Sequence, residues 1–359
     1  MMYDDIAEQG VVVQYHNGPN VYEGVPKNYT GGSVTSENFL QVLQGQNIGV
    51  GSAKVIASGP NDRIFVFSGH GGPGFLQFPN GRDRLFAKKF IGVIKKMHKD
   101  KKYAKMVVYV EACYAGSMFR GRHLKDLNLY ATTAANASEY SYSLWPGMVK
   151  GVPLGNVYSV NWMEHSEKSN LMVTTVSDQY NEVRRKTKGS RVTQYGDSSM
   201  GKLYLSEFQG RKNPRQDTVK KGPCKPIPNW NVHIAILDEK ILNAKDASVK
   251  KSLQQKRKQT LENRDFFERK IAEIATFIAA EKKDKAKSLL TSEKDVINFD
   301  CYEAALRHFE DRCFSLSANP YALHHLRVLV NACESGFQMR DITSAIDSAC
   351  THPTIRGIV

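Results

Sequence analysis

Apolar residues follow one pattern in the first 210 residues of the chain and another after about residue 243. In the first part, short and almost continuously apolar runs alternate with amphipathic segments, which is typical of strands joined by crossover helices around a mostly parallel sheet. Three runs are expected to be strands covered on both faces, namely residues 62–67 (DRIFVF), 105–110 (KMVVYV) and 129–134 (LYATTA). This part therefore predicts an α/β domain.

The remaining patterns divide the rest of the chain. Residues 87–98 carry apolar side chains at helical spacing, opposite lysines, which predicts a crossover helix between the first two strands. Residues 210–230 contain four prolines and many charges and are expected to be an exposed connector rather than a regular element. Farther on, Gly and Pro are sparse and apolar residues recur on helical faces, which predicts a helical bundle. We expect an α/β domain over residues 1–210, a linker over 211–242 and a helical domain over 243–359.

The chain is basic, with a formal net charge of +14 in 359 residues. The excess is greatest in residues 211–290, where 20 Lys and Arg stand against 10 Asp and Glu. These charges are spread along polar faces without interleaved aromatic residues, which favours a solvated helical surface over a nucleic-acid interface. No run approaches the roughly 18 consecutive apolar residues of a membrane helix, so no membrane span is expected. The opening residues MMYDDIAEQG show no signal peptide.

Two reactive side chains follow neighbouring strands of the predicted sheet. His70 stands in SGHGGPG after the first strand, and Cys113 stands in EACYAGS after the second. Because the carboxyl ends of neighbouring parallel strands meet at one edge, we expect these side chains to lie close together. An imidazole can favour the reactive thiolate and supply a proton to a leaving amine. The surrounding glycines make the Gly71 and Cys113 amides candidates for an oxyanion hole.

Each of these residues alone also has a structural explanation. A single cysteine at a strand end is more often a small buried hydrophobic residue, and a single histidine is more often structural. Together they resemble the caspase signature Gln-Ala-Cys-x-Gly, whose histidine lies about 50 residues upstream. Here Glu-Ala-Cys-Tyr-Ala-Gly places its cysteine 43 residues after His70. The pair predicts a cysteine peptidase.

Longer strings extend the resemblance over almost the whole chain. MMYDDIA, VYEGVPKNYTG, EACYAGSMF, YATTAAN, YSVNWME and QYG resemble the legumain family of asparaginyl endopeptidases, which has a caspase-like fold. CYEAALRHFEDRCF and YALHHLRVLVNACE resemble the helical prodomain of that family.

This resemblance implies a zymogen that cleaves after Asn, and less readily after Asp, in acidic compartments. Cys113 and His70 would form the catalytic dyad, and Glu111 and Ser141 would belong to the pocket that binds the Asn side chain. The prodomain would cap the active site near neutral pH and be released by acid. No cofactor is implied, and the implied partners are peptide substrates, the chain's own prodomain and cystatin-type inhibitors.

The resemblance also pairs four cysteines of the C-terminal part, as Cys301–Cys333 and Cys313–Cys350. The residues alone leave three pairings open. A zinc site is the alternative, because histidines lie nearby, but no C-x2-C spacing appears. Those histidines are His308, His324 and His325.

Disulfides require an oxidising compartment, and the sequons at Asn28 and Asn136 point the same way. The resemblance therefore implies a lysosomal, vacuolar or secreted glycoprotein. In the family, a signal peptide, a first strand and a first helix precede the segment that resembles MMYDDIA, and we expect the chain as given to lack them. In the family, a loop of this preceding segment carries an Asn that orients the catalytic His and an Arg that helps to form the Asn-binding pocket.

Other positions also depart from the family pattern. Gly69 stands where Asp is usual, and Tyr114 stands where Glu is usual. In the pocket, Tyr140 replaces Ser and Asn156 replaces Asp. Loss of a pocket carboxylate weakens the prediction of Asn specificity, because a primary amide is recognised by paired donors and acceptors. A catalytically impaired binding protein of the same fold is therefore the alternative function.

Zymogen cleavage is expected at an exposed Asn of the connector. Asn243 stands close to the position that the resemblance implies, with Asn229 and Asn231 as alternatives. A structural role for Asn243 as a helix N-cap is equally compatible with the sequence. A related transamidase that attaches lipid anchors shares the dyad, but it would lack the four-cysteine helical domain and carry a membrane span.

Overall fold

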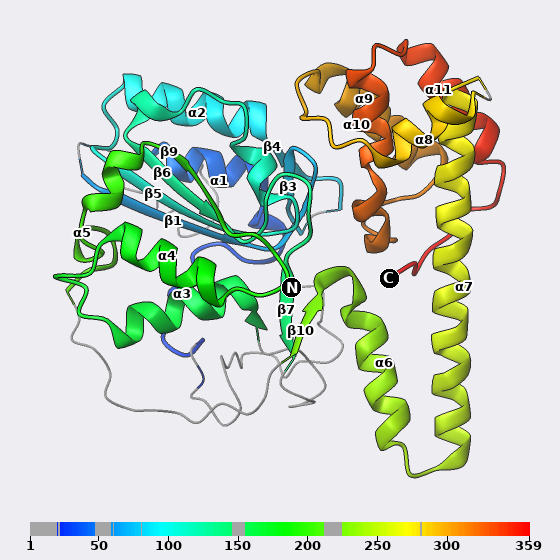
Figure 1. Ribbon diagram of the computed structural model, residues 1–359, viewed down its shortest axis with the longest axis horizontal. Helices are drawn as coiled ribbons and strands as arrows, with labels where there is room; N and C mark the ends of the chain where they lie inside the picture. The colour runs from blue at the N-terminus through cyan, green and yellow to red at the C-terminus, as the bar shows by residue number, and fades with distance from the viewer. Residues whose placement is uncertain are drawn as a thin grey trace. The chain divides into compact units, whose positions relative to one another are not determined.

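The computed structural model describes residues 20, 22–46, 59, 61–79, 81–145, 155–211, 225–280 and 282–359. The chain divides into two compact units, Met1–Asn229 and Trp230–Val359. The first unit contains the sheets, and the second is helical (Figure 1).

A four-stranded mixed sheet forms the centre of the first unit, in the order β1-β5-β6-β9 (Figure 1). β1 (Arg63–Ser68), β5 (Met106–Glu111) and β6 (Leu129–Thr133) run parallel, and β9 (Thr193–Gly196) is antiparallel to β6. β5 and β6 are buried at every position, as their continuous apolar runs require. The three predicted strands are thus confirmed to within one residue at each end. The expectation that all three are covered on both faces is wrong for β1, which is exposed at every second described position.

Helices cover both faces of this sheet. α2 (Ala87–Lys99) is the predicted crossover between β1 and β5 and covers one face, while α3 (Val157–Lys168) and α4 (Val176–Lys186) cover the other (Figure 1). The apolar residues that gave α2 its helical pattern are buried. On the opposite face, aromatic residues of the sheet and of both helices share one core, which contains Tyr109, Tyr130, Tyr158 and Tyr180. α1 (Ser36–Leu43) and the short α5 (Ser206–Gln209) complete the helices described in this unit.

Two small antiparallel sheets stand at the edge where the parallel strands end. One contains β2 (His70–Gly72), β3 (Phe75–Gln77) and β4 (Arg84–Phe86). The other has the order β10-β7-β8 and contains β7 (Tyr142–Trp145) and β8 (Gly155–Asn156). These small sheets carry His70, Gly71 and Asn156, whereas Glu111 ends β5 and Cys113 and Ser141 lie in connecting segments.

The third strand of the second small sheet, β10 (Lys225–Pro228), corrects a prediction. It pairs antiparallel with β7, so the expectation of an irregular connector is wrong at these residues. Pro226 and Pro228 are opposite Leu144 and Tyr142, and the next amide, that of Asn229, donates to Ser141, the residue before β7. The prolines therefore fall at alternate positions where an N–H would face away from β7, and they remove no hydrogen bond of the pairing. Residues 212–224 lie outside the described residues.

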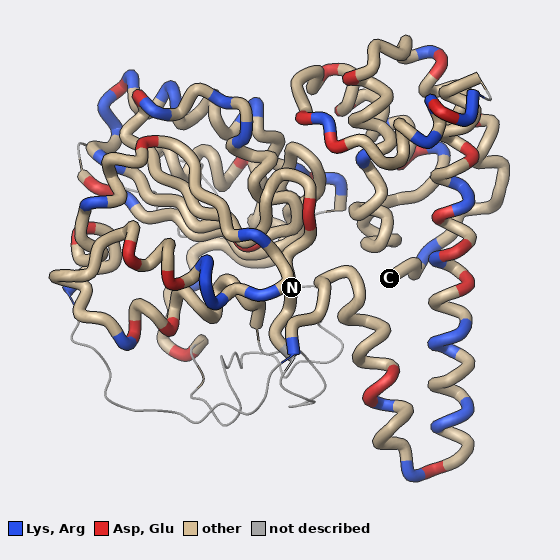
Figure 2. The backbone as a smooth tube through the Cα atoms, viewed as in Figure 1, with Lys and Arg blue, Asp and Glu red and all other residues tan. Residues whose placement is uncertain are grey.

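The second unit is the predicted helical bundle. Its longest helix, α7 (Ala247–Ile278), follows α6 (Val232–Asn243), which lies in the stretch expected to be linker. Figure 2 shows basic residues along α7 together with acidic ones, and two pairs of them form ion pairs, Lys258–Glu262 and Lys270–Glu273. The other helices are α8 (Lys283–Thr291), α9 (Phe299–Arg312), α10 (Arg327–Glu334) and α11 (Met339–Ala349).

Two disulfides connect these helices. Cys301–Cys333 joins α9 to α10, and Cys313–Cys350 joins the end of α9 to the end of α11. Both are the pairs that the family resemblance implies. Among the described helices, none is long and apolar enough to cross a bilayer.

Candidate active site

Cys113 lies in the loop that follows β5, at the carboxyl end of the parallel strands. The next residue, Tyr114, has a φ of +56°, a left-handed conformation that few residues with a side chain adopt. The chain therefore turns sharply directly after the cysteine. The Tyr114 amide donates to the Glu139 carbonyl oxygen (2.8 Å), and the Gly116 amide donates to the Ala135 carbonyl oxygen (3.1 Å). These bonds fix the cysteine loop against the segment that follows β6.

His70 begins β2 directly after β1, at the same edge of the sheet. The Gly69 amide donates to the carbonyl oxygen of Glu111 (3.0 Å), which continues the pairing of β1 with β5. A β-carbon on Gly71 would lie 2.5 Å from the Cys113 carbonyl oxygen. The backbone around His70 is therefore packed against the backbone around Cys113. The structure brings together the two segments that the sequence singled out.

Loss of hydration controls the protonation of both side chains. It lowers the pKa of His70 to about 4 and raises the pKa of Cys113 to about 11, although hydrogen bonds from Ser141 partly oppose the second shift. Cys113 is only 2% exposed. Near neutral pH, this state therefore holds a neutral imidazole and a neutral thiol, and a proton must leave the sulfur as it attacks.

Glu111, the last residue of β5, is a buried carboxyl group behind the cysteine. One of its oxygens accepts hydrogen bonds from the backbone amide (3.1 Å) and the hydroxyl (2.9 Å) of Ser159 on α3. Its other oxygen is buried and accepts no hydrogen bond within the described residues. Burial raises the pKa of Glu111 to about 7. The group is therefore a neutral acid at acidic pH, able to donate as well as accept.

Ser141 connects the cysteine to the small sheet. Its amide donates to the Cys113 sulfur (3.4 Å), and its hydroxyl oxygen lies 3.7 Å from the same sulfur. On its other side it receives Asn229, the residue that follows β10. The Asn229 amide donates to the Ser141 carbonyl oxygen (3.1 Å), and its Nδ2 donates to the Ser141 hydroxyl (2.6 Å).

The other end of the Asn229 carboxamide is bound as well. Its Oδ1 accepts a hydrogen bond from the Ser143 hydroxyl at 2.5 Å. Ser143 Oγ also lies 3.0 Å from Oδ1 of Asn156, the residue opposite it on β8. The carboxamide is thus held between the hydroxyls of Ser141, which precedes β7, and Ser143 on β7, at the site where Cys113 is anchored.

Sequence reasoning named Glu111, Ser141, Tyr140 and Asn156 for this pocket. Glu111 lies within two residues of Cys113, Ser141 binds the Asn229 carboxamide, and Asn156 contacts Ser143. The ring of Tyr140 instead packs edge-on against the Tyr114 ring, with 5.4 Å between the ring centroids. Two further residues, Ser143 and Ser159, were missed. Ser143 could have been found, because it lies two residues after Ser141 and residues at this spacing in an extended segment share a face. Ser159 had none, because only packing brings α3 to β5.

The remaining predicted sites lie elsewhere. Asn28 and Asn136 are both partly exposed. Asn243 is exposed at the last position of α6, and Asp246 caps α7 by accepting from the Ser248 and Val249 amides. The alternative that Asn243 is a helix N-cap is therefore wrong. Processing at Asn243 stays a prediction.

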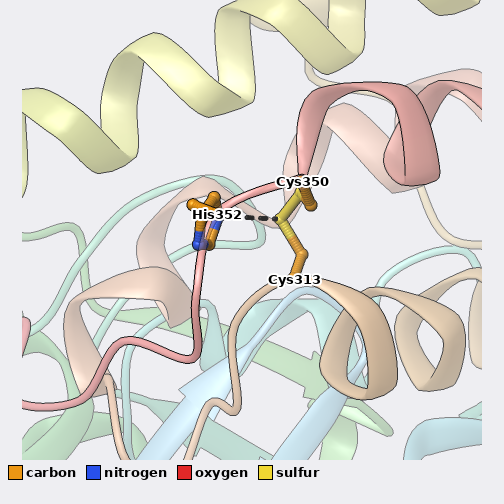
Figure 3. A group of neighbouring side chains, drawn as sticks. All are labelled: Cys313, Cys350 and His352. Atoms are coloured by element: carbon orange, nitrogen blue, oxygen red, sulfur yellow. Dashed lines mark hydrogen bonds between the residues drawn. A yellow bond between two sulfur atoms is a disulfide. The ribbon is translucent and has the colours of Figure 1, made fainter.

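One group of possible metal ligands occurs in the described part of the chain, formed by Cys313, Cys350 and His352 (Figure 3). The two sulfurs are bonded to each other, and His352 Nε2 lies 4.0 Å from Cys313 Sγ. A disulfide sulfur is not the thiolate that zinc requires. The three histidines considered for zinc from the sequence are not members of this group.

Comparison with known families now adds to the geometry. Residues 1–211 match the Peptidase C13 family, and residues 255–350 match the legumain prodomain. The chain belongs to the Peptidase C13 family. It is 38% identical to legumain of Homo sapiens over 366 residues, which cover 98% of this chain and 83% of the relative. It is 36% identical to a hemoglobinase of Schistosoma mansoni (98% and 82% covered) and 38% identical to a vacuolar-processing enzyme of Phaseolus vulgaris (97% and 77% covered).

Membership of this family makes the chain a cysteine peptidase with a prodomain. The prodomain match begins within α7 and ends at Cys350, so it contains all four disulfide-bonded cysteines. The peptidase match ends at residue 211 and contains the segments that carry Cys113 and His70.

Proposed function

We propose that this C13 peptidase hydrolyses peptide bonds after Asn, and less readily after Asp, at acidic pH. The observation that carries the proposal is the binding of the chain's own Asn229. A carboxamide has a donor at one end and an acceptor at the other, and Ser141 and Ser143 accept and donate in the matching order. An Asn side chain of a substrate, bound in the same way, would lie beside Cys113.

The reaction uses Cys113 as nucleophile and His70 as acid and base. The sulfur attacks the carbonyl carbon, and its proton moves to the imidazole. The amides of Gly71 and Cys113 hold the oxyanion. His70 then gives the proton to the leaving amine, and water hydrolyses the thioester to a carboxylic acid and restores the thiol. The close packing of Gly71 on Cys113 supports this assignment, because it brings together the two residues whose amides would donate.

The acidic optimum follows from the carboxyl group behind the cysteine. An ionised Glu111 would repel the thiolate that forms and any Asp side chain in the pocket. Since its pKa is about 7, acid removes this charge. A substrate Asp must also be protonated to provide the donor that Asn always has, so its cleavage requires a lower pH.

The proposal extends to processing and location. The helical unit would act as the prodomain of a zymogen, released after cleavage in the connector, with Asn243 as the expected site. Two disulfides favour an oxidising compartment, and a relative named vacuolar-processing enzyme supports a lysosomal or vacuolar one. Cystatin-type inhibitors and glycosylation at Asn28 and Asn136 belong to the same proposal.

A binding protein without catalytic activity is the second candidate, favoured by the burial and raised pKa of Cys113. A fluorogenic peptide that ends in Asn separates the two. The protein is acidified to about pH 4.5 and assayed at about pH 5.5 beside Cys113→Ala. Turnover that the substitution abolishes supports the peptidase. Absence of turnover by folded protein would instead favour the binding protein.

A further inference from the structure

We propose that Ser143 is a specificity-determining residue of this pocket, whose hydroxyl binds the side-chain carbonyl oxygen of the substrate residue before the cleaved bond. The inference rests on the proposed peptidase function and adds a residue and a selectivity to it. Its basis is the way in which the first unit binds Asn229.

The segment that ends in Asn229 is bound as an extended substrate would be. β10 adds to the free edge of β7 as an antiparallel strand, and the Asn229 amide continues this pairing by donating to the Ser141 carbonyl oxygen. Addition of a strand to a sheet edge is a common mode of peptide recognition, with backbone bonds for affinity and side-chain pockets for selectivity. In this arrangement the pocket side chain is a carboxamide, and Ser143 is its partner at the oxygen end.

Ser143 needs a second partner to direct its hydroxyl. A serine hydroxyl has one hydrogen to give, yet Ser143 Oγ lies near two oxygens, 2.5 Å from Asn229 Oδ1 and 3.0 Å from Asn156 Oδ1. The shorter contact takes the hydrogen. A 180° turn of the Asn156 amide then presents its NH2 group to Ser143, so that Ser143 accepts from Asn156 while it donates to Asn229.

These hydrogen bonds indicate a role for Asn156 that the sequence alone did not suggest. A carboxylate at position 156 has no hydrogen to donate and would compete with the substrate for the hydroxyl hydrogen of Ser143. The neutral Asn156 leaves that hydrogen to the substrate. Asn156 is therefore a positioning residue that acts through Ser143, and the two side chains replace the pocket carboxylate expected at this place.

The selectivity that follows concerns the oxygen alone. Asn and protonated Asp both offer a carbonyl oxygen to Ser143, whereas Ala offers none. Loss of one such hydrogen bond leaves a buried group unsatisfied and should reduce kcat/KM about tenfold for Asn and Asp peptides. Cleavage of an otherwise identical Ala peptide should not change. The ratio of Asn to Ala cleavage is thus the diagnostic quantity.

The test measures kcat/KM of the acid-activated full chain on three peptides that differ only in having Asn, Asp or Ala at this position. Ser143→Ala should lower the Asn-to-Ala ratio about tenfold, and Ser143→Thr, which keeps a hydroxyl, should restore most of it. Asn156→Asp should also lower the Asn-to-Ala ratio, with a KM that rises for the Asn and Asp peptides and not for the Ala peptide. A general folding defect would affect all three peptides. Ser199→Ala, an exposed serine outside the pocket, is the matched control and should change nothing. An unchanged Asn-to-Ala ratio in Ser143→Ala would overturn the inference.

A binding measurement keeps the inference separate from the peptidase proposal. Calorimetry is performed with the same Asn and Ala peptides on the double variant Cys113→Ala, Asn229→Ala, which does not cleave and has no carboxamide of its own between Ser141 and Ser143. Addition of Ser143→Ala should weaken Asn-peptide binding about tenfold. If the wild-type chain cleaves nothing but this loss is seen, the peptidase proposal fails and the role of Ser143 stands. If binding is equal with and without Ser143, the role of Ser143 is wrong whatever the activity.

Discussion

Gly71 faces the carbonyl oxygen of Cys113 so closely that a β-carbon on its α-carbon would lie 2.5 Å from that oxygen. Gly71→Ala must therefore separate the segments that carry His70 and Cys113. We expect peptide turnover to fall at least about tenfold and the free energy of unfolding to fall by about 1–3 kcal/mol. Turnover assays and urea denaturation measure the two effects.

Gly92→Ala provides the control for that experiment. Gly92 is a helical glycine of α2 that would have open space around a β-carbon. It should keep its activity and gain slightly in stability, because Ala favours a helix. Equal activity of the Gly71 and Gly92 variants would contradict a tight contact at the active site.

Glu111 should make the first unit more stable in acid than above neutral pH. Burial raises the pKa of its carboxyl from 4.5 to about 7, so the folded state holds the proton more tightly than the unfolded state. This contribution is fully present below about pH 4.5 and is lost as the pH rises through about 7, at a cost of about 3 kcal/mol. Urea unfolding at about pH 5 and about pH 8 should show the loss in the wild type and a much smaller one in Glu111→Gln. Parallel losses in both proteins would exclude Glu111 as the cause.

His325 should have the opposite effect on the helical unit. Burial lowers its pKa from 6.5 to about 4, with Glu268 opposing and Arg264 adding to the shift. The neutral ring packs 5.3 Å from Phe267 and 4.9 Å from Tyr321, measured between ring centroids. The contribution of His325 to the free energy of unfolding is therefore fully present above about pH 6.5. It is lost as the pH falls through about 4, at a cost of about 3 kcal/mol.

His325→Phe tests this effect, since it keeps an aromatic ring but cannot bind a proton. Unfolding of the helical unit, followed by circular dichroism at about pH 7 and about pH 4, should change less with pH in the variant. His308→Phe is a useful comparison, because His308 Nε2 lies 3.1 Å from Asp347 Oδ1 at the surface of the helical unit. The inference fails if His325→Phe is as acid-sensitive as the wild type.

The two disulfides should stabilise the helical unit to a similar degree. They join residues 32 and 37 positions apart, so each restricts a loop of similar length in the unfolded chain. Replacement of either pair by alanines should lower the free energy of unfolding by about 3–4 kcal/mol. Urea titrations of both double variants without reductant measure this. A large difference between them would show that local packing, not loop length, sets the effect.

The elements that could be predicted from sequence are those whose pattern is local. The runs that form β5 and β6 are apolar on both faces, and α2 has one apolar stripe. Each of these patterns by itself indicates whether the segment is a strand or a helix. β10 could not be recognised in this way, because KPIP contains two prolines and one apolar residue. Its pairing depends on β7, which lies about 80 residues earlier in the chain.

The same distinction applies to the site. Cys113 and His70 could be paired from sequence because each directly follows a recognisable strand of one parallel sheet. Ser159 reaches Glu111 only through the packing of α3, and Asn229 reaches Ser141 only because β10 joins the small sheet. Contacts of this kind depend on tertiary structure, which no local pattern records.

The prolines of β10 have a consequence for association between molecules. One edge of β10 pairs with β7. At its other edge, the backbone positions that would donate hydrogen bonds outward belong to Pro226 and Pro228, which have no N–H. A strand from a second copy that approached this outer edge of β10 would receive no hydrogen bonds from Pro226 and Pro228 to its own carbonyl oxygens. The small sheet can therefore receive one strand and then stop, which protects the protein from aggregation by edge-to-edge strand addition at this position.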